Sequence, residues 1–397
     1  MNIQTKNPAF GATALITGCC VGAGMLGLPL VTMSSGFLLS IIPLLIGWSY
    51  MYMSGLMVLE VYLDSKKNIN LMGLLNEVLG KGAKIIGAGL FLFLFYSILT
   101  AYLNASSILI QGACNELLKI DFSQSFYLIL NALILFTIIL FSTRKVDLIN
   151  RFLVVCMLFF YVGLIYIGLS QVDPVNLKTF SNASTVVWSI PVFILSFGFQ
   201  NLIPTISHYL NYDAKRIKSA IFRGTFAALV IYLIWNFIIL GAISNQDQRV
   251  VESGTSALNQ LFNSSSPQVA FFIKGFSFFA IITSVLAVSL SFVNFISDSS
   301  ENQKKHAFYT ACVIVPPVIF SFLNPDIFLT MLHIAGGIGA VCLFGILPPM
   351  MIWKKRYVLK TQHQKIFPFE KFTTASYLLG SIAVIILEIL NLTCRQS

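Results

Sequence analysis

Four glycines and a proline fall within twelve residues near the start of the chain, in Gly18-Cys19-Cys20-Val21-Gly22-Ala23-Gly24-Met25-Leu26-Gly27-Leu28-Pro29. Glycine costs about 1 kcal/mol and proline about 3 kcal/mol in a helix interior, so this segment favours an interrupted helix. It lies inside an apolar run, about 9–34, that is long enough to cross a bilayer. Hydrocarbon offers no partners for freed backbone groups, so a broken helix is tolerated only where it lines a cavity or a site. We therefore predict that this backbone contacts a solute.

A second interruption of the same kind occurs at Ser196-Phe197-Gly198-Phe199-Gln200-Asn201-Leu202-Ile203-Pro204, inside the apolar run 184–209. Interrupted helices at corresponding positions of two halves of a chain are typical of transporter binding sites. The free N–H groups at the start of a half-helix favour an anionic group such as a carboxylate. Glycine in membrane helices also permits close packing of neighbouring helices, which is the alternative interpretation of both segments.

These segments belong to a strongly apolar chain. It has 57% hydrophobic and 10% charged residues, whereas soluble domains carry about 25% charged residues. The formal net charge of +10 comes from basic residues in short loops, a pattern that determines membrane topology rather than nucleic-acid binding. The seven cysteines lie mostly inside apolar runs, where cysteine behaves as a small hydrophobic residue. We therefore predict a protein of the lipid bilayer, without a nucleic-acid partner or a metal site.

Eleven apolar runs approach the length of about 20 residues that a transmembrane helix needs. They are approximately 9–34, 37–62, 85–112, 125–142, 151–171, 184–209, 221–243, 268–297, 307–323, 326–352 and 373–392. The chain is therefore predicted to be an all-α polytopic membrane protein with about 11 transmembrane helices, forming one transporter domain over 1–397.

The basic residues predict the orientation of these helices. With the N-terminus placed in the cytoplasm, 20 of the 25 lysines and arginines fall on cytoplasmic segments. Positively charged short loops stay on the cytoplasmic side. The N-terminus is therefore predicted to be cytoplasmic and the C-terminus periplasmic.

The two interruptions also predict an internal repeat. Gly24 and Gly198 are 174 positions apart, close to the length of a block of five spans. Because five is odd, two such blocks enter the membrane with opposite polarity and form an inverted repeat. Repeat one would cover about 9–171 and repeat two about 184–352, with the helix at about 373–392 as an addition. A binding site is expected near the membrane midplane, between broken helices 1 and 6.

Five motifs along the chain carry a resemblance to a known family. They are Gly22-Ala23-Gly24-Met25-Leu26 with Pro29; Leu59-Glu60-Val61-Tyr62; Tyr96 with Leu99-Thr100-Ala101-Tyr102; Val146-Asp147-Leu148 with Asn150-Arg151-Phe152-Leu153; and Ser196-Phe197-Gly198-Phe199 with Pro204. On these motifs, the chain resembles the hydroxy/aromatic amino acid permease family of bacterial inner membranes, and within it the tyrosine-specific permeases. The resemblance extends from about residue 8 to about residue 392.

The resemblance implies the fold of the amino acid–polyamine–organocation superfamily and the import of an aromatic amino acid with a coupling cation. It implies that backbone groups of the first break hold the substrate carboxylate, and that carbonyls around Phe197 and Phe199 hold its ammonium group. Tyr96 or Tyr102, on the third span, would close the pocket. The substrate-binding residues implied in this way are Val21, Gly22, Ala23, Gly24, Met25, Tyr96, Tyr102, Phe197, Gly198, Phe199 and Gln200.

Three positions depart from the family pattern by lacking a titratable group. Many relatives carry a histidine at the position of Gln200. Proton-coupled relatives carry a lysine at the position of Met157, and relatives carry an aspartate at the position of Asn294. A side-chain amide cannot carry a proton in their place. The coupling ion is therefore left open between a proton, which family habit favours, and sodium.

Ionisable residues inside the membrane are costly to insert and are candidates for proton coupling. Glu60 and His333 are the candidates in this chain. Gate pairing or snorkelling is the alternative role for Glu60, and an ordinary buried hydrogen bond is the alternative for His333. Glu388 lies on the eleventh span, outside the repeat, and is not expected to take part in coupling.

A sodium ion would need oxygen ligands and no titratable group. Thr283 and Ser284 on the eighth span, with carbonyls of Gly18 and Val21 on the first, are the candidates. Such hydroxyls also bond to carbonyls of their own helix, which is the alternative interpretation.

The predicted function is secondary active import of tyrosine, or more broadly of aromatic amino acids, across the bacterial inner membrane by cation-coupled symport, without a cofactor. Sodium-coupled or exchange transport of another amino acid or amine is the first alternative. A solute sensor or a channel with a transporter fold is the second. The sequence has no GxxxxGK[ST], HExxH or GxSxG motif, so neither an ATP-driven pump nor an enzyme is expected. The oligomeric state is left open.

Overall fold

The computed structural model describes residues 8–22, 24–65, 69–119, 122–140, 143–178, 185–243, 266–297, 303–360, 365–367 and 370–396, and every regular element in them is helical. The first half contains α1 (Pro8–Cys20), α2 (Gly24–Thr32), α3 (Gly36–Leu63), α4 (Leu71–Leu79), α5 (Lys81–Leu118), α6 (Gln124–Ile139), α7 (Thr143–Gly168), η1 (Leu169–Gln171) and α8 (Pro174–Lys178). The second half contains α9 (Thr185–Ser196), η2 (Gln200–Leu202), α10 (Ile203–Tyr209), α11 (Ala214–Ala242), α13 (Pro267–Ser297), α14 (Gln303–Leu323), α15 (Ile327–Ile334), η4 (Ala335–Ile346), α16 (Leu347–Trp353), η5 (Lys354–Val358) and α17 (Lys371–Gln396).

The predicted all-helical membrane fold is confirmed. Among the described residues, nine helical runs are long and apolar enough to cross a membrane, and the bent pair α1–α2 raises the number to ten. The sixteen-residue α6 is apolar but shorter. These helices occupy the eleven apolar runs of the sequence.

Polar side chains define where several of the helices begin. The side chain of Asn70 accepts a hydrogen bond from Gly73 N at the start of α4, at 2.8 Å. Ser123 caps α6 and Asp213 caps α11 in the same way. Such caps satisfy N–H groups that have no partner within the first helical turn. Short polar connections therefore separate long apolar helices.

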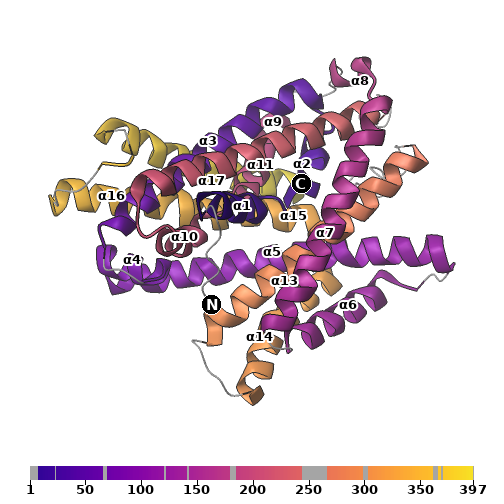
Figure 1. The fold of residues 1–397 in the computed structure, drawn as a ribbon, viewed down its shortest axis with the longest axis horizontal. Coiled ribbons are helices and arrows are strands. Elements are labelled where there is room, and N and C mark those ends of the chain that lie inside the picture. Colours follow the sequence, from indigo (N-terminus) through magenta and orange to yellow (C-terminus); the bar gives the residue numbers. More distant parts are fainter. Residues whose placement is uncertain are drawn as a thin grey trace.

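Helices of corresponding rank in the two halves lie together. The helices α1, α2 and α3 pack with α9, α10 and α11, so the first two spans of one block contact the first two of the other. In a second group, α5 and α6 pack with α13 and α14. Figure 1 shows α3, α9 and α11 running side by side, with α5 crossing the molecule beneath them. The segment α15–η4 contacts both groups, because it packs on α9 and on α5.

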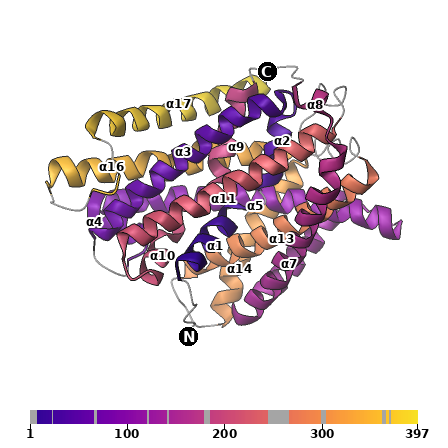
Figure 2. The ribbon, with the colours of Figure 1, turned by 45° about the horizontal axis from the view of Figure 1, so that its top comes forward.

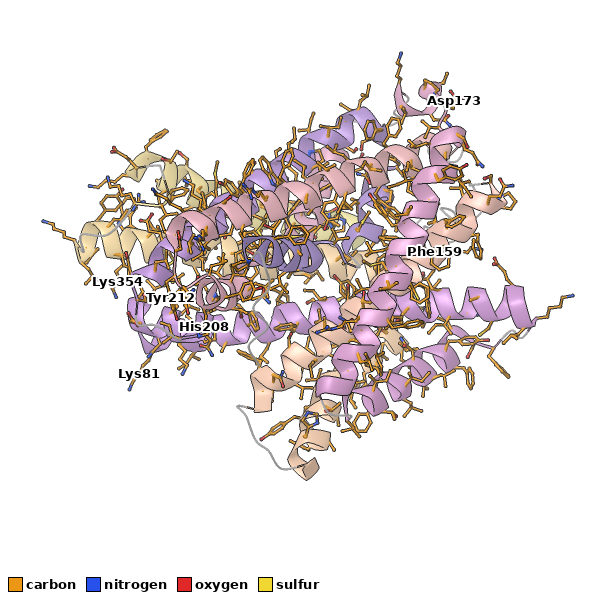
Figure 3. All side chains as sticks on the ribbon, viewed as in Figure 1. Lys81, Phe159, Asp173, His208, Tyr212 and Lys354 are labelled. Atoms are coloured by element: carbon orange, nitrogen blue, oxygen red, sulfur yellow. The ribbon has the colours of Figure 1, made fainter. Side chains whose placement is uncertain are left out.

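Charged residues from separate loops gather at one end of the molecule. Figure 3 places Lys81 and Lys354 near His208 at one end, with Asp173 at the opposite end. Lys81 begins α5 and Lys354 begins η5, and the sequence predicts the same side of the membrane for both. Their common end therefore agrees with that expected sidedness.

The C-terminal helix α17 lies along the edge of the bundle, beside α16 (Figure 2). It also packs on η4 and α9. The helix η4 is π-helical over twelve residues, and its glycines allow close approach. An ideal Cβ on Gly336 would lie 2.0 Å from Pro191 O in α9, and one on Gly337 would lie 2.5 Å from Glu388 Cγ in α17. The tenth span is therefore held between α9 and α17.

Candidate functional site: two broken helices that meet

The two helix breaks lie against each other. The helix α1 ends at Cys20 and α2 begins at Gly24, with an angle of 52° between their axes. The helix α9 ends at Ser196, and α10 begins only after the short turn η2. The thiol of Cys19 donates a hydrogen bond to Gly198 O at 3.4 Å. Residues 179 positions apart in the sequence therefore contact each other where both helices stop.

One tyrosine hydroxyl joins the ends of both first half-helices. Tyr232 on α11 donates to Cys20 O at 2.5 Å and to Ser196 O at 2.8 Å. Both carbonyls lie at helix C-termini, where the last C=O groups have no partner within the helix and the helix dipole is negative. A hydroxyl carries one proton and serves one acceptor fully at a time. The two carbonyls thus converge on a point that favours a donor with more than one hydrogen.

The first break requires glycine because other elements approach its backbone closely. An ideal Cβ on Gly24 would lie 3.1 Å from Ser196 Oγ, and one on Gly22 would lie 2.6 Å from Ser284 Oγ. Val21 still continues the ladder of α1 by donating to Thr17 O at 2.8 Å. Met25 N donates to Gly22 O at 3.0 Å, and the Met25 side chain is fully buried. The predicted site residue Ala23 lies outside the described residues.

The second break is a tight turn packed with aromatic rings. Phe197 N donates to Ile194 O and Gly198 N to Leu195 O, at 3.2 and 3.1 Å. The rings of Phe197 and Phe199 are fully buried. The Phe197 ring meets Tyr232 edge-on, with ring centroids 5.0 Å apart.

The side chain of Gln200 is engaged by the protein itself. Its Oε1 accepts from Phe199 N at 3.0 Å, and its Nε2 donates to Met51 O at 3.1 Å. The side chain is fully buried. Gln200 therefore holds the turn of the second break against α3.

The structure separates the two tyrosines predicted for the pocket. Tyr102 on α5 is 7% exposed, and its hydroxyl hydrogen-bonds the backbone of Gly24 at the start of α2. Tyr96 points elsewhere: its hydroxyl donates to Cys312 O in α14 at 2.9 Å, and its ring meets Phe292 of α13 edge-on. Tyr102 therefore lies beside the helix breaks, whereas Tyr96 packs between α5, α13 and α14.

Open space lies on one side of the first break. Ala14, Leu15, Gly18 and Cys19 share one face of α1 and are all exposed, and a Cβ on Gly18 would meet no atom within 4 Å. Cys19 is exposed although it lies beside buried Tyr102. On the other side of the break, every residue of α2 from 24 to 30 is buried.

The helix α1 begins near the end of the molecule that carries Lys81 and Lys354. A Cβ on Gly11, near the start of α1, would lie 2.8 Å from the Tyr209 hydroxyl. Tyr209 closes α10 next to His208, which Figure 3 places at that end. The exposed face of α1 therefore lies on the side of the break toward the end with Lys81 and Lys354, whereas the residues of α2 that follow the break are buried.

The two hydroxyl candidates for a sodium site, Thr283 and Ser284, lie on α13. Ser284 approaches Gly22, as the distance above indicates. Thr283 Oγ1 donates to Phe279 O at 2.9 Å and to Ala280 O at 3.0 Å within its own helix, which was the alternative interpretation for this hydroxyl. The structure brings Gly22 and Ser284 together. Gly18 lies on α1, four residues before Gly22.

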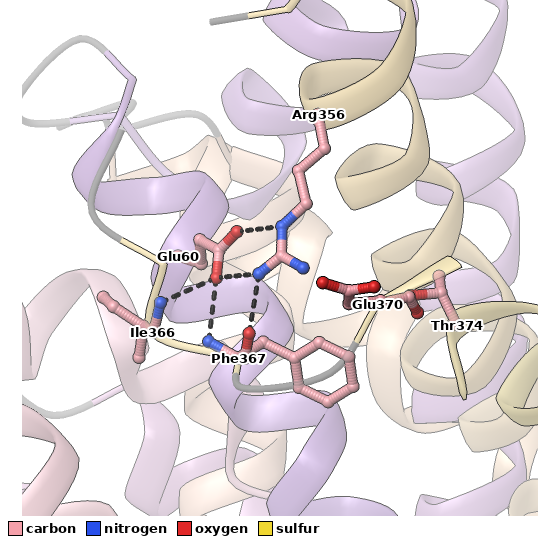
Figure 4. A network of polar contacts seen from close by, with 6 residues as sticks. All are labelled: Glu60, Arg356, Ile366, Phe367, Glu370 and Thr374. Atoms are coloured by element: carbon pink, nitrogen blue, oxygen red, sulfur yellow. Dashed lines mark hydrogen bonds and ion pairs between the residues drawn. The ribbon is translucent and has the colours of Figure 1, made fainter. Parts of the chain in front are cut away.

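Glu60 is held in an extensive network at the end of α3 (Figure 4). Arg356 binds it through two hydrogen bonds, Nε to Oε1 at 2.6 Å and Nη2 to Oε2 at 2.7 Å. The backbone N–H groups of Ile366 and Phe367 donate to Oε2 at 2.9 and 2.8 Å. Glu60 is 5% exposed. Of the two roles considered for it, the pairing role fits this geometry, since four donors already engage the carboxylate.

His333 on α15 lies against Glu388 on α17. His333 Nδ1 and Glu388 Oε2 are 3.3 Å apart, and both side chains are buried, at 1% and 0% exposure. The amide of Asn391 lies 3.5 Å from the same ring nitrogen. Glu388 thus contacts a candidate coupling residue.

Tyr232 was not identified from the sequence, and the side chains of Cys19 and Cys20 were interpreted only as small hydrophobic residues. Tyr232 lies inside the apolar run of the seventh span, and a polar tip on a membrane helix signals that a buried partner exists. Nothing in the sequence indicates that its partners are carbonyls of Cys20 and Ser196.

Comparison with known proteins agrees with this architecture. The model of the tryptophan/tyrosine permease family matches residues 5–388. The chain belongs to this family. The tyrosine-specific transport system 1 of Haemophilus influenzae is 27% identical to this permease over 364 residues, covering 88% of this chain and 89% of that protein. The tryptophan-specific transport protein of Pseudomonas aeruginosa is also 27% identical, over 355 residues, covering 86% and 85%.

A solved structure of low sequence identity has the same fold. Mhp1, a nucleobase-cation-symport-1 family transporter in a closed conformation with bromovinylhydantoin bound, aligns with a TM-score of 0.59 at 13% identity, covering 97% of this permease and 92% of Mhp1. Family and structural neighbours are membrane transporters, not enzymes. This permease is therefore a multi-pass membrane transport protein of an amino acid transporter family.

Proposed function

We propose that this permease is a secondary active transporter that imports tyrosine, or more broadly aromatic amino acids, across the bacterial inner membrane by cation-coupled symport. The observation that carries the proposal is the meeting of three half-helix ends at one place. The carbonyls of Cys20 and Ser196, at the ends of α1 and α9, converge on Tyr232. The start of α2, at Gly24, lies beside Tyr102.

An α-amino acid has the charges that this arrangement requires. Its ammonium group carries three donors and suits carbonyls at the negative ends of two helices. In the proposal it replaces the Tyr232 hydroxyl on at least one of the carbonyls of Cys20 and Ser196. Its carboxylate suits the N-terminus of α2, where N–H groups favour an anion. The Tyr102 hydroxyl, already at Gly24, would donate to the same carboxylate.

The aromatic preference rests on the rings around the breaks and on the relatives. Tyr102, Phe197 and Tyr232 present ring edges and faces within this cluster, and ring pairs add about 0.5–1.5 kcal/mol beyond buried area. The relatives described above carry the names of tyrosine and tryptophan transport proteins at equal identity. We propose tyrosine as the principal substrate, with tryptophan as the first competitor.

We also propose alternating access, and the difference between the two sides of the first break supports it. The exposed face of α1 leads to the break from one end, whereas α2 is buried on the other side. The excess of basic residues favours the cytoplasm as the location of the basic end, so we assign this arrangement to a state open to the cytoplasm. In this assignment the N-terminus is cytoplasmic and the C-terminus periplasmic, and the two five-helix blocks form an inverted repeat around the site.

A radiolabelled uptake assay tests the proposal. Purified permease in proteoliposomes is given labelled tyrosine with a proton gradient or a sodium gradient imposed separately, and unlabelled tryptophan, phenylalanine and glutamine as competitors. The expected result is uphill accumulation under one gradient, with tryptophan competing better than glutamine. Counterflow without accumulation under either gradient would replace symport by exchange. Absence of both accumulation and counterflow would overturn the proposed substrate.

A further inference from the structure

The buried face of α17 is polar along its whole length. Thr374, Tyr377, Ser381, Glu388 and Asn391 are all buried, and their spacing of three, four and seven places them on one side of a helix. Apolar residues of the same helix, such as Leu379, Ile386 and Leu390, are exposed instead. A helix in lipid gains nothing by burying such groups unless they bond within the protein. The additional helix therefore brings polar groups into the transporter.

The N-terminal part of this face, with Tyr377 and Ser381, packs against neighbouring helices. Tyr50 on α3 and Ser381 have their hydroxyl oxygens 2.7 Å apart, and Ser381 Oγ lies 3.0 Å from Gly345 O. Tyr377 donates to Tyr50 O at 3.0 Å. These groups satisfy one another and attach α17 to α3 and η4.

Glu388 lies two turns further along α17 and pairs with His333 of α15. This pair is different because one of its polar atoms lacks a hydrogen-bond partner in the part of the chain that the structure describes. Oε2 of Glu388 lies 3.3 Å from His333 Nδ1, but the buried Oε1 has no hydrogen-bond partner among the described residues. A buried carboxylate with one free oxygen is costly. The pair is least costly when it holds one proton in total, because its net charge is then zero, either as neutral groups or as an ion pair.

The charged residues of the elements packed around the pair lie near the ends of their helices. Among the described residues, α2, α9 and α16 carry no titratable side chain. The remaining titratable residues of the packed elements are Tyr50, Tyr52, Glu60 and Tyr62 on α3, Lys81, Lys84, Tyr96, Tyr102, Cys114 and Glu116 on α5, Cys342 on η4, and Lys371, Tyr377, Cys394 and Arg395 on α17. Tyr50, Tyr96, Tyr102 and Tyr377 engage the partners given above.

The helix that carries His333 touches both broken helices. Leu332, the neighbour of His333, approaches α2 so closely that a Cβ on Gly27 would lie 2.7 Å from its Cδ1. One turn later, Gly336 lies against Pro191 O of α9. A change of charge at His333 and Glu388 therefore acts on an element in contact with both half-helices that border the proposed substrate site.

We propose that His333 and Glu388 form the proton-binding site that couples transport, which rests on the proposed function of this permease as a cation-coupled amino acid importer. In the closed state, the dry pair holds one shared proton. When water reaches the pair on the side of low proton concentration, the proton leaves to water and the pair becomes His333 with an ionised, hydrated Glu388. Reprotonation from the opposite side restores the neutral pair and allows it to be buried again.

The substitution Glu388→Gln tests the coupling role, because it retains size and one acceptor but removes the titrating group. Proteoliposomes containing the variant should lose tyrosine accumulation driven by a proton gradient, down to an inside-to-outside ratio of about one, while tyrosine counterflow persists. Glu388→Asp should restore part of the accumulation. Ser381→Ala, on the same face two turns away, is the matched control and should accumulate tyrosine as the unsubstituted permease does. Full proton-driven accumulation by the Glu388→Gln variant would overturn the proposal.

Infrared difference spectroscopy on the purified permease gives a readout that needs no transport. Titration should produce a carboxylic-acid C=O band that disappears as pH rises and that is absent from Glu388→Gln. His333→Gln should shift that titration, and it provides a second variant if Glu388→Gln does not fold. Identical difference spectra of the unsubstituted permease and Glu388→Gln would overturn the proton site. If the permease moved no tyrosine at all, the proposed function would fail while these spectra still decided the site.

Discussion

The thiol of Cys19 and the carbonyl oxygen of Gly198 are 3.4 Å apart, although 179 positions separate the two residues in the chain. Each residue belongs to a helix break, and each break exposes backbone groups that a continuous helix would use internally. Their contact therefore brings the free ends of two broken helices to one point. That point has the features that an amino acid backbone needs, namely carbonyls for the ammonium group and a helix N-terminus for the carboxylate.

The close approach at Gly24 gives the first prediction. A side chain there would collide with Ser196, whose Oγ lies 3.1 Å from an ideal Cβ, and overpacking of a tight contact costs about 1–3 kcal/mol. We expect Gly24→Val to abolish tyrosine uptake while the protein still inserts into the membrane. The measurement is labelled uptake in cells, normalised to the amount of permease in the membrane. Gly89→Val on α5, where a Cβ meets no atom within 4 Å, is the control and should transport normally.

Tyr232→Phe should tighten substrate binding. The variant keeps the ring but removes the hydroxyl that occupies the carbonyls of Cys20 and Ser196, so the substrate ammonium no longer competes with it. A hydrogen bond contributes about 0.5–1.5 kcal/mol, so Kd for tyrosine should fall by roughly 2- to 10-fold.

Scintillation proximity binding measures this Kd directly. Tyr161→Phe is the matched control, since its hydroxyl donates to Ile231 O of α11 at 3.0 Å and not to a carbonyl of a broken helix. Weaker binding by Tyr232→Phe than by this control would show that the substrate uses the hydroxyl itself, which contradicts the replacement step.

The two tyrosines of α5 should behave differently. Tyr102 hydrogen-bonds the backbone of Gly24, whereas Tyr96 donates to Cys312 on α14. Tyr102→Ala should weaken the apparent affinity for tyrosine by roughly tenfold, as loss of an aromatic pair of about 1.5 kcal/mol would do, and should affect a small amino acid less. Tyr96→Phe should leave the affinity unchanged. Competition assays with tyrosine and alanine measure both effects, and equal losses for the two substrates would contradict a contact between the Tyr102 ring and the aromatic side chain of the substrate.

Glu60 and Arg356 form a buried pair whose partners depend on each other. Removing one partner of such a pair costs about 3–5 kcal/mol, because the other remains buried without its counter-charge. We expect Glu60→Gln and Arg356→Gln each to lower the unfolding temperature of the detergent-solubilised permease. The double variant should lose less than the sum of the two single losses. Additive losses in this double-mutant cycle would contradict direct pairing. Lys354→Gln, two residues before Arg356, is the control.

The sequence located both breaks because glycine and proline have strong local effects. The predicted segments 18–29 and 196–204 contain the ends of α1 and α9 and the starts of α2 and α10. The positions of the membrane spans could also be predicted, since the length of an apolar run can be read directly from the sequence. The short helix α4 was not predicted: it lies between the second and third spans and is too short to register as a membrane run.

Contacts between distant helices could not be predicted in this way. Tyr232 reaches Cys20 across 212 positions, and no local pattern indicates which carbonyl a buried hydroxyl will meet. For the same reason, Tyr96 and Tyr102 looked equivalent on one helix until their partners were known. Glu388 was set aside because its helix lies outside the repeat, whereas the structure places its carboxylate against His333. Sequence reasoning thus found the elements of the site but not the side chains that connect them.

Protection of Cys19 by substrate tests the central claim most directly. Cys19 is exposed beside the two breaks, while Cys20 is buried. A variant that retains Cys19 and has its other cysteines replaced is treated with a small hydrophilic maleimide in inside-out vesicles, with and without tyrosine. The account predicts that tyrosine slows alkylation of Cys19 in a saturable manner and that glutamine does so less. Alkylation at the same rate with and without saturating tyrosine would contradict a substrate site between the broken helices.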